Sequence, residues 1–277
     1  MTNTVYRLSL RPARAADREP AVAWCDTLWD GQPDYIRHTW EHWQAEGNLL
    51  VGVQPPADDP VALLRMRQLS PGEAWFGGLR IHPRLQGQGI GRQLIAFAFE
   101  WARARGAATL GYMTETVNER MHHLGAALGF RRAGRISWHD LAPFDATPAA
   151  ITRDPAGIVL AQAANLRAQA GLYFTGWAVQ RLTPDRLAHH AAAGELVRDA
   201  GSGAWMILEQ QAADLIYVSH AEGDAAELRG RLAWAGRAHP ACALAAPLWD
   251  GTPHLALAQE LGWRPTGEAY SIFEREV

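Results

Sequence analysis

Three glycines alternate with other residues in the segment Gln86-Gly87-Gln88-Gly89-Ile90-Gly91, which follows an apolar run and precedes an amphipathic one. Glycine lets the backbone approach a ligand closely and lets successive N–H groups point in one direction. A helix that begins at such a loop adds unpaired N–H groups and the positive end of its dipole. The segment therefore predicts an anion site suited to a pyrophosphate, flanked by Arg84 and Arg92.

Two other phosphate-binding patterns do not fit this loop. A P-loop needs Gly-Lys followed by Ser or Thr, whereas Gly91 is followed by Arg92 and Gln93. A dinucleotide fingerprint needs its third glycine at the position of Arg92, and no clean strand with an acidic end follows. The chain contains no lysine, and all 26 of its basic residues are arginines. Arginine must therefore make any cationic contact to a phosphate, and no lysine can form a Schiff base.

The loop resembles the acyl-CoA signature Q/R-x-x-G-x-G/A of the GNAT (Gcn5-related) N-acetyltransferases, through Gln86, Gly89 and Gly91. Three further features between residues 74 and 134 are similar to that family: the strand Leu79–Pro83, the asparagine Asn118 and the L-G-F of Leu128–Phe130. Their order along the chain is the family's order, which makes the resemblance more specific than a lone G-x-G.

The resemblance implies an α/β fold with a mixed sheet and helices on both faces. It also implies that the protein uses acetyl-CoA as cosubstrate. The pantetheine arm would lie between two splayed parallel strands, 74–82 and 108–113. The backbone N–H of Ile81 would polarise the thioester carbonyl, and a primary amine would attack directly. The CoA-binding residues that the resemblance implies are Ile81, Gln86, Gly87, Gln88, Gly89, Ile90, Gly91, Arg92 and Asn118.

The sequence indicates the general acid and the general base of the expected reaction less clearly than the CoA loop. The family often carries a tyrosine acid at the position of Gly125, so the nearest replacement is Tyr112, with a merely packed tyrosine as the alternative. Glu73 is the candidate general base, and Glu115 and Asp34 are weaker candidates. A solvated carboxylate is the alternative interpretation of all three acids.

We expect no metal. The segment His38–His42 matches the zinc-peptidase pattern H-x-x-E-H, but nothing else in the chain suggests a protease. Cys25 and Cys242 are far apart and form no C-x-x-C pair, so neither a cysteine zinc site nor a disulfide framework is expected. A single bridge between the two cysteines stays open at this point.

The second half of the chain resembles a degenerate repeat of the first. Leu128–Arg131 and Leu261–Arg264 share the pattern L-G-aromatic-R, and a glycine follows each of them at the same spacing. We therefore predict two tandem GNAT-like folds that form a pseudo-dimer within one chain, with Trp138 and Trp263 in corresponding strands.

The predicted domains are a catalytic GNAT domain at 1–142, a linker with a connecting helix at 143–170, and a degenerate GNAT-like domain at 171–277. The segment Ser219–Asp224 stands where the second copy should have its glycine loop, and its two acids would repel a pyrophosphate. The first 142 residues contain 16 arginines and 14 acids, whereas the remainder contains 10 and 15. We therefore expect CoA to bind the first copy only.

Composition sets the broader expectations. The 277 residues are 48% apolar and 20% charged, a globular balance, and a net charge of −3 gives no chain-wide positive field for nucleic acid. No apolar run is long enough to span a membrane, and the N-terminus has no signal-peptide layout, so a cytoplasmic protein is expected. The predicted partner is a small-molecule amine, and the assembly is a monomer or homodimer. The alternatives to an enzyme are a non-catalytic acyl-CoA sensor and an interaction protein that has lost CoA.

Overall fold

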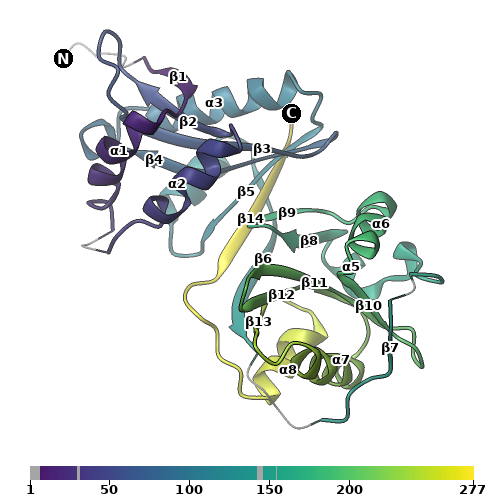
Figure 1. Cartoon of the computed structure of the whole chain (residues 1–277). Helices are drawn as coiled ribbons and strands as arrows, with labels where there is room; N and C mark the ends of the chain where they lie inside the picture. The colour runs from purple at the N-terminus through teal and green to yellow at the C-terminus, as the bar shows by residue number, and fades with distance from the viewer. Residues whose placement is uncertain (1–6, 30–31, 142–145, 154) are drawn as a thin grey trace. The chain divides into compact units, whose positions relative to one another are not determined.

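The computed structural model describes residues 7–29, 32–141, 146–153 and 155–277, and it divides into two compact units (Figure 1). Unit 1 consists of the chain up to Tyr112 with His122–Phe130 and Glu274–Val277, and unit 2 consists of Met113–Met121 and Arg131–Phe273. Each compact unit is therefore built from segments that are not contiguous in the sequence. The predicted boundaries at 142 and 170, which separate sequence copies, stay a prediction, and residues 143–145 and 154 of the predicted linker lie outside the described residues.

Unit 1 is built on a mixed sheet in the order β1-β2-β3-β4-β5, followed by the end of β14. Its strands are β1 (Ser9–Pro12), β2 (Leu49–Val53), β3 (Ala62–Ser70), β4 (Glu73–Ile81), β5 (Thr109–Glu115) and β14 (Tyr270–Glu276). Its helices are α1 (Arg18–Cys25), α2 (Ile36–Ala45), α3 (Ile90–Arg103) and α4 (Glu119–Ala127). The first four strands pair antiparallel, and β4 pairs with β5 in parallel. The predicted strands 74–82 and 108–113 and the helix predicted after the glycine loop are present, with strand ends shifted by one or two residues.

Helix α3 forms where the sequence predicts it because its apolar residues recur on one face. Ile90, Leu94, Ala98 and Ala102 are spaced four residues apart and are all buried. The helix packs on β4 and β3 through this face. The glycine loop is thus joined to a helix whose position is fixed by burial.

The parallel pairing of β4 with β5 is short. It consists of three residue pairs, which begin at Glu73–Thr109 and end at Trp75–Gly111, although β4 continues to Ile81. The hydrogen-bonded pairing of the two strands therefore stops well before β4 ends, as the predicted splayed strands require.

A bulge interrupts β4 beyond the end of that ladder. Leu63 pairs with Arg80 and Arg65 with Gly77, so two residues of β4 stand opposite one residue of β3. Gly78, one of the two, has φ +58°, and a Cβ there would lie 2.6 Å from the ring of Trp43. Only glycine lets α2 pack this closely on the strand, so the bulge positions the end of β4 against α2.

Unit 2 repeats this plan. Its sheet runs from the start of β14 through β6-β13-β12-β11-β10-β7, and a separate pair is formed by β8 and β9. The strands are β6 (Arg131–Asp140), β7 (Ile151–Thr152), β8 (Leu172–Thr175), β9 (Ala178–Arg181), β10 (Leu196–Asp199), β11 (Trp205–Ala212), β12 (Leu215–Ala221) and β13 (Ala243–Trp249). The helices are α5 (Ala164–Ala168), α6 (Pro184–Ala192), α7 (Ala225–Ala238) and α8 (Pro253–Glu260). β12 pairs with β13 in parallel, again through three residue pairs.

Two sequence predictions for the second half are wrong. The connecting helix predicted at Ile158–Ala170 is a short 3-10 turn followed by the five-residue helix α5, because Ala163 between them is extended. Trp263 lies after α8 and outside any strand, whereas Trp138 lies in β6. The offset of the shared L-G-aromatic-R pattern pairs Trp263 with Phe130, so Trp263 matches a loop residue of the first copy.

The C-terminal residues complete unit 1. Val277 donates its N–H to the carbonyl of Ala108 at 3.0 Å, and the guanidinium of Arg275 bonds the carbonyl of Leu128 and lies 4.4 Å from the centre of the Phe99 ring.

Deletion of Glu274–Val277 is expected to destabilise the protein, because it uncovers the edge of β5 and breaks these contacts. We expect the thermal midpoint to fall by roughly 4–8 °C, the shift for a loss of about 2 kcal/mol in a chain of this size. Arg275→Ala alone, at an exposed position, should cost about 1 kcal/mol or less. An unchanged midpoint in the deletion variant, measured by calorimetry, would contradict the assignment of these residues to unit 1.

Candidate active site

The glycine loop leaves its backbone open to solvent at the beginning of α3. Gly87 and Gly89 have φ values of +75° and +78°, and a Cβ at either position would meet no atom within 4 Å. Gly89 is the N-cap of α3 and has no side chain to satisfy the first N–H groups of the helix. The cradle therefore fits the expected pyrophosphate: exposed donors, a helix dipole and room for a ligand.

Side chains next to the loop fix its shape. Gln86 donates from Nε2 to the carbonyl of Ile81 at 3.2 Å, and Gln88 donates to the carbonyl of Arg84 at 2.7 Å. Ile90 is buried at the beginning of α3, and Arg92 is exposed on its first turn. Gln86 and Gln88 thus hold the loop through their side chains, and Arg92 is the residue of this group with a charge to offer.

The backbone N–H of Ile81 points away from β3. Successive N–H groups of a strand point to opposite sides, and His82 donates its own N–H to Val61, just before β3, at 2.9 Å. The N–H of Ile81 therefore points toward the β5 side, where the ladder has already ended. A backbone donor in this position suits a thioester carbonyl.

Glu73 lies at the other end of the same strand. It is the first residue of β4 and Ile81 is the last, so roughly 25 Å of extended chain separate them. Glu73 accepts a hydrogen bond from Ser70 at 3.1 Å, beside the closed end of the β4–β5 ladder. The prediction of Glu73 as general base is therefore incompatible with a reaction centre at Ile81.

Tyr112 takes the space that a side chain at residue 125 would need. A Cβ on Gly125 would lie 2.0 Å from the hydroxyl oxygen of Tyr112. The Tyr112 ring stacks on Phe76 with 4.9 Å between ring centres, directly beyond the last β4–β5 pair. Burial raises the pKa of Tyr112, so the hydroxyl keeps its proton at neutral pH. A strand therefore places a phenol where the family's pattern expects one from α4.

The tyrosine, the loop and Ile81 are connected through α4. A Cβ at Gly91 would lie 3.0 Å from Leu124 and 3.6 Å from the side chain of Ile81. Leu124 precedes Gly125, against which the hydroxyl of Tyr112 lies. The structure thus brings the loop, Ile81 and Tyr112 together within unit 1.

A buried ion pair that sequence reasoning missed anchors the end of β4. Arg80 bonds Asp34 through Nε at 2.6 Å, and its guanidinium lies 5.2 Å and 5.0 Å from the ring centres of Trp29 and Tyr35. Burial opposes the charge on Asp34, but the hydrogen bond and charge of Arg80, with bonds from Trp29 and from the N–H of Ile36, hold its pKa below the usual value. Asp34 is therefore a weak base that positions β4. No spacing signal joins two residues 46 positions apart.

Asn118 has a local role. Its Oδ1 accepts the N–H of Met121 at 3.2 Å, and its Nδ2 donates to Thr114 at 3.1 Å, so it caps the beginning of α4. It belongs, with Glu115, to the segment that groups with unit 2. Its predicted contact to CoA, and any role of Glu115, stay predictions.

A family model matches one part of the chain. The model of the acetyltransferase (GNAT) family matches residues 17–130. Residues 17–130 are a GNAT acetyltransferase domain. A search of curated proteins found no match.

Solved structures resemble the whole chain and show its fold. A putative acetyltransferase from Thermoplasma acidophilum has a TM-score of 0.58 at 16% identity, over 99% of this chain and 95% of that one. A GCN5-related N-acetyltransferase from Sphaerobacter thermophilus has a TM-score of 0.61 at 16% identity, over 97% and 95%. A tandem GNAT protein from the clavulanic acid biosynthesis pathway has a TM-score of 0.55 at 15% identity, over 98% of both chains. The α/β fold with two tandem GNAT-like copies is thus confirmed.

Among the residues of unit 2 that the structure describes, none forms a counterpart of the open loop in the GNAT domain. Asp224 is the N-cap of α7, where it accepts the N–H of Glu227 at 2.9 Å, and Glu227 accepts the N–H of Asp224 in return. Glu222 accepts the N–H groups of Asn165 and Leu166 at the beginning of α5. The donors that Gly89 leaves open in the GNAT domain are satisfied by this chain's own carboxylates in unit 2.

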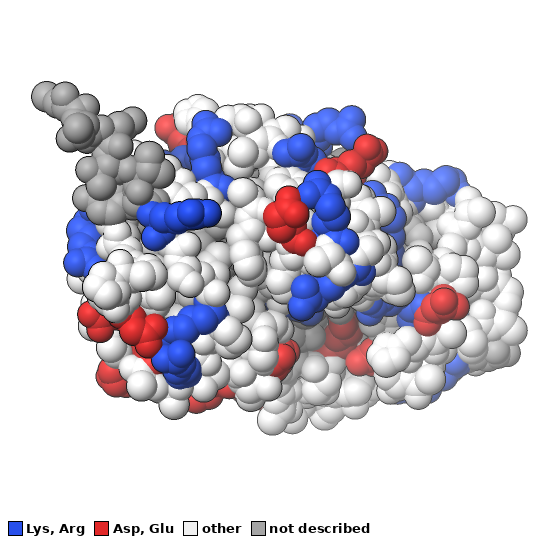
Figure 2. All heavy atoms as spheres, turned by 90° about the horizontal axis from the view of Figure 1, so that it is seen from above, with Lys and Arg blue, Asp and Glu red and all other residues white. Residues whose placement is uncertain are grey.

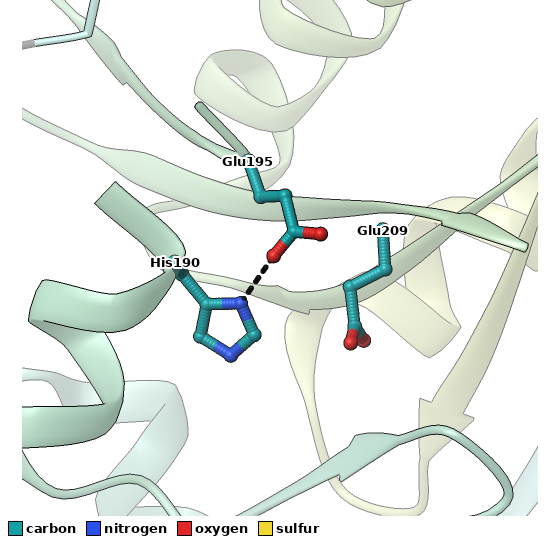
Figure 3. A group of neighbouring side chains, drawn as sticks. All are labelled: His190, Glu195 and Glu209. Atoms are coloured by element: carbon teal, nitrogen blue, oxygen red, sulfur yellow. Dashed lines mark hydrogen bonds and ion pairs between the residues drawn. The ribbon is translucent and has the colours of Figure 1, made fainter. Parts of the chain in front are cut away.

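Within the described part of the chain, one group of three candidate metal ligands lies close together, in unit 2 (Figure 3). His190 of α6 bonds Glu195 at 2.7 Å and the hydroxyl of Tyr173 at 2.9 Å, and Glu209 of β11 accepts from Thr175 and Ser219. These atoms satisfy one another, as expected of a buried polar network. His38 and His42 of the H-x-x-E-H pattern are exposed and outside this group.

The surface and the cysteines add little to the site. Arginines and acids are interspersed on the face in Figure 2. Cys25 and Cys242 are both free thiols, so the bridge left open by the sequence is not formed. Among the helices that the structure describes, none combines the length and apolar character of a membrane span.

Asp34→Asn is expected to destabilise the GNAT domain strongly, because it leaves the guanidinium of Arg80 buried without its counter-charge. We expect a loss of about 3–5 kcal/mol in urea unfolding at pH 7. Glu260→Gln removes an exposed partner of Arg229 at 2.6 Å and should cost about 1 kcal/mol or less.

The pH dependence has a defined sign. The folded pKa of Asp34 lies below 3.8, so its contribution is present above that value and is lost as the pH falls through the folded pKa. The stabilities of wild type and Asp34→Asn should converge in acid. Parallel curves down to the lowest pH would contradict this assignment.

Proposed function

We propose that the protein transfers an acetyl group from acetyl-CoA to a primary amine by direct attack, with one working site in the GNAT domain. The observation that carries this proposal is the open glycine loop, where Gly87 and Gly89 hold left-handed conformations at the beginning of α3. Two features near the loop favour an anion: Arg84 and Arg92 are exposed beside it, and the helix dipole points at it.

In this proposal the N–H groups of Gly87–Gly91 bind the pyrophosphate, and the N–H of Ile81 donates to the thioester carbonyl oxygen as it gains negative charge. The amine nitrogen bonds to the carbonyl carbon and loses one proton to solvent water, the C–S bond breaks, and the thiolate takes one proton from a donor that solvent then reprotonates. Tyr112 supplies that proton, which fits its protonated, buried hydroxyl. We assign no residue as base, because Asp34 is held in an ion pair and Glu73 lies at the far end of β4.

The exposed aromatic side chains of Trp29 and Tyr35 support a small amine as acceptor. They are 42% and 49% exposed and lie against Arg80, at the end of β4 that carries Ile81. They offer apolar surface near the proposed reaction centre. A cytoplasmic location is part of the proposal, and the two free cysteines support it.

Gly89→Glu is expected to abolish CoA binding, because it adds a negative side chain where a phosphate must approach. Gly106→Glu is the matched control: Gly106 also has positive φ and open space, but it lies beyond the other end of α3. Calorimetry should show one CoA per wild-type chain, the same for Gly106→Glu, and none for Gly89→Glu. Arg92→Ala should weaken binding by about 1–3 kcal/mol. Full binding by Gly89→Glu would refute the site.

Tyr112→Phe is expected to lower kcat on the order of 10²-fold while the affinity for CoA stays the same, because it removes only the proton donor. Tyr173→Phe, which changes a buried tyrosine of unit 2, should leave kcat unchanged. Because burial raises the pKa of Tyr112, the wild-type profile should show no loss of activity from this group near its ordinary pKa of 10.0. Equal kcat values for wild type and Tyr112→Phe would reduce Tyr112 to a packing residue.

The second candidate is an acyl-CoA sensor without catalysis, and the observation that favours it is the lack of an assigned base. Thiol release from acetyl-CoA, followed with a panel of small primary amines, separates the two functions. Binding of CoA with no thiol release for any amine would favour the sensor.

A further inference from the structure

Unit 2 contains a small cavity just beyond the point where β12 and β13 separate. Their pairing ends at Tyr217–Ala245, and the cavity, of about 20 Å³, is lined by the residues that follow on both strands, Val218–Ala221 and Ala246–Trp249. Leu228 of α7 and His254 of α8 also line it. In the GNAT domain the equivalent place, beyond the β4–β5 ladder, is the proposed acyl site.

Three residues that line this cavity each have a buried polar atom without a hydrogen-bond partner within the protein. The three atoms are Oε1 of Gln169, Nδ1 of His220 and Nε1 of Trp249. The three residues are only 4–5% exposed, so bulk water does not reach these atoms. Buried polar atoms of this kind are nearly always hydrogen-bonded. Leaving three of them unpaired would lower the stability of the folded protein, because each has lost its hydrogen bonds to water.

Their chemistry defines what would satisfy them. His220 bonds the carboxylate of Glu222 through Nε2 at 2.9 Å, so Nε2 carries the proton and Nδ1 is an acceptor in the neutral ring. Gln169 offers a carbonyl oxygen, a second acceptor, and Trp249 offers an indole N–H, which can only donate. The residues that line the cavity thus present two acceptors and one donor.

We propose that this cavity binds one water molecule as a fixed part of unit 2. A water molecule donates twice and accepts, which complements two acceptors and one donor, and buried waters typically make about three hydrogen bonds. A volume of about 20 Å³ is enough for one water and too small for an acyl chain. An anion is disfavoured because two of the three atoms are acceptors. In this proposal, the space beyond the short ladder of β12 and β13 holds a single water.

The test uses the full-length protein and water itself as the probe. In a water-selective rotating-frame NMR experiment, the indole N–H of Trp249 should show a cross-peak to a long-lived water. Trp24 is the matched control, because it is also buried but donates its indole N–H to the carbonyl of Pro60 at 2.9 Å. Trp249→Phe assigns the signal. A cross-peak at Trp249 and none at Trp24 supports the proposal, whereas no cross-peak at Trp249 overturns it.

A filling variant and a crystal structure keep the proposal falsifiable if Trp249→Phe fails to fold. Ala246 lines the cavity, so Ala246→Val should displace the water and remove the Trp249 cross-peak while CoA binding by the GNAT domain stays unchanged. A high-resolution crystal structure of the wild type should show one density peak within hydrogen-bond distance of all three atoms. A dry cavity, or side chains turned to pair with one another, would overturn the inference.

Discussion

Parallel pairing that stops after three residue pairs is the constraint on which both halves of this chain depend. β4 and β5 are paired from Glu73–Thr109 to Trp75–Gly111, and β12 and β13 from Leu215–Ala243 to Tyr217–Ala245. Beyond these points each strand continues without its neighbour, so N–H groups and side chains face space that the ladder would otherwise fill. A backbone donor such as Ile81 is available to a ligand only because this ladder is short.

The two units differ in the N-cap residue of the helix that follows the diverging strand. α3 and α7 each have 14 residues, and each begins shortly after its strand. α3 has Gly89 as its N-cap, whereas α7 has Asp224, which forms a reciprocal cap with Glu227. A carboxylate of the chain itself competes with any external anion for the same N–H groups and repels it. The two helix ends therefore differ in whether their first N–H groups are left open or satisfied by a carboxylate of the chain.

The features predictable from sequence are those that depend on local spacing. The alternating glycines and the four-residue spacing of apolar residues in α3 each belong to one short segment, and the structure contains the helix that they predict. Apolar and alanine-rich sequence predicts a longer helix than α5, whereas the carboxylate of Glu222, distant in sequence, caps the helix at Asn165. The helix propensity of a segment does not show which distant residue will cap it after folding.

The same limit explains the site residues. Glu73 was attractive because it begins the correct strand, but a strand has two ends, and only the pairing register shows that the open end is at Ile81. The ion pair of Arg80 with Asp34 joins β4 to the beginning of α2 across 46 positions, and the bulge at Gly78 depends on the ring of Trp43. A pair of adjacent glycines inside an apolar strand was the one sequence signal available for that bulge.

Tyr112 and Gly125 constrain each other in a way that bears on the chemistry. With the hydroxyl 2.0 Å from where a Cβ would be, residue 125 has to remain glycine as long as Tyr112 keeps its position. The phenol is then held by β5, stacked on Phe76 and edge-on to Phe130, rather than by a helix turn. Packing on two rings restricts its rotamer, which places the hydroxyl more rigidly than a side chain on the surface of α4 could be placed. The hydroxyl of Tyr112 is thus held by a strand but lies against α4 at Gly125, next to Leu124, which lies near Gly91 of the loop.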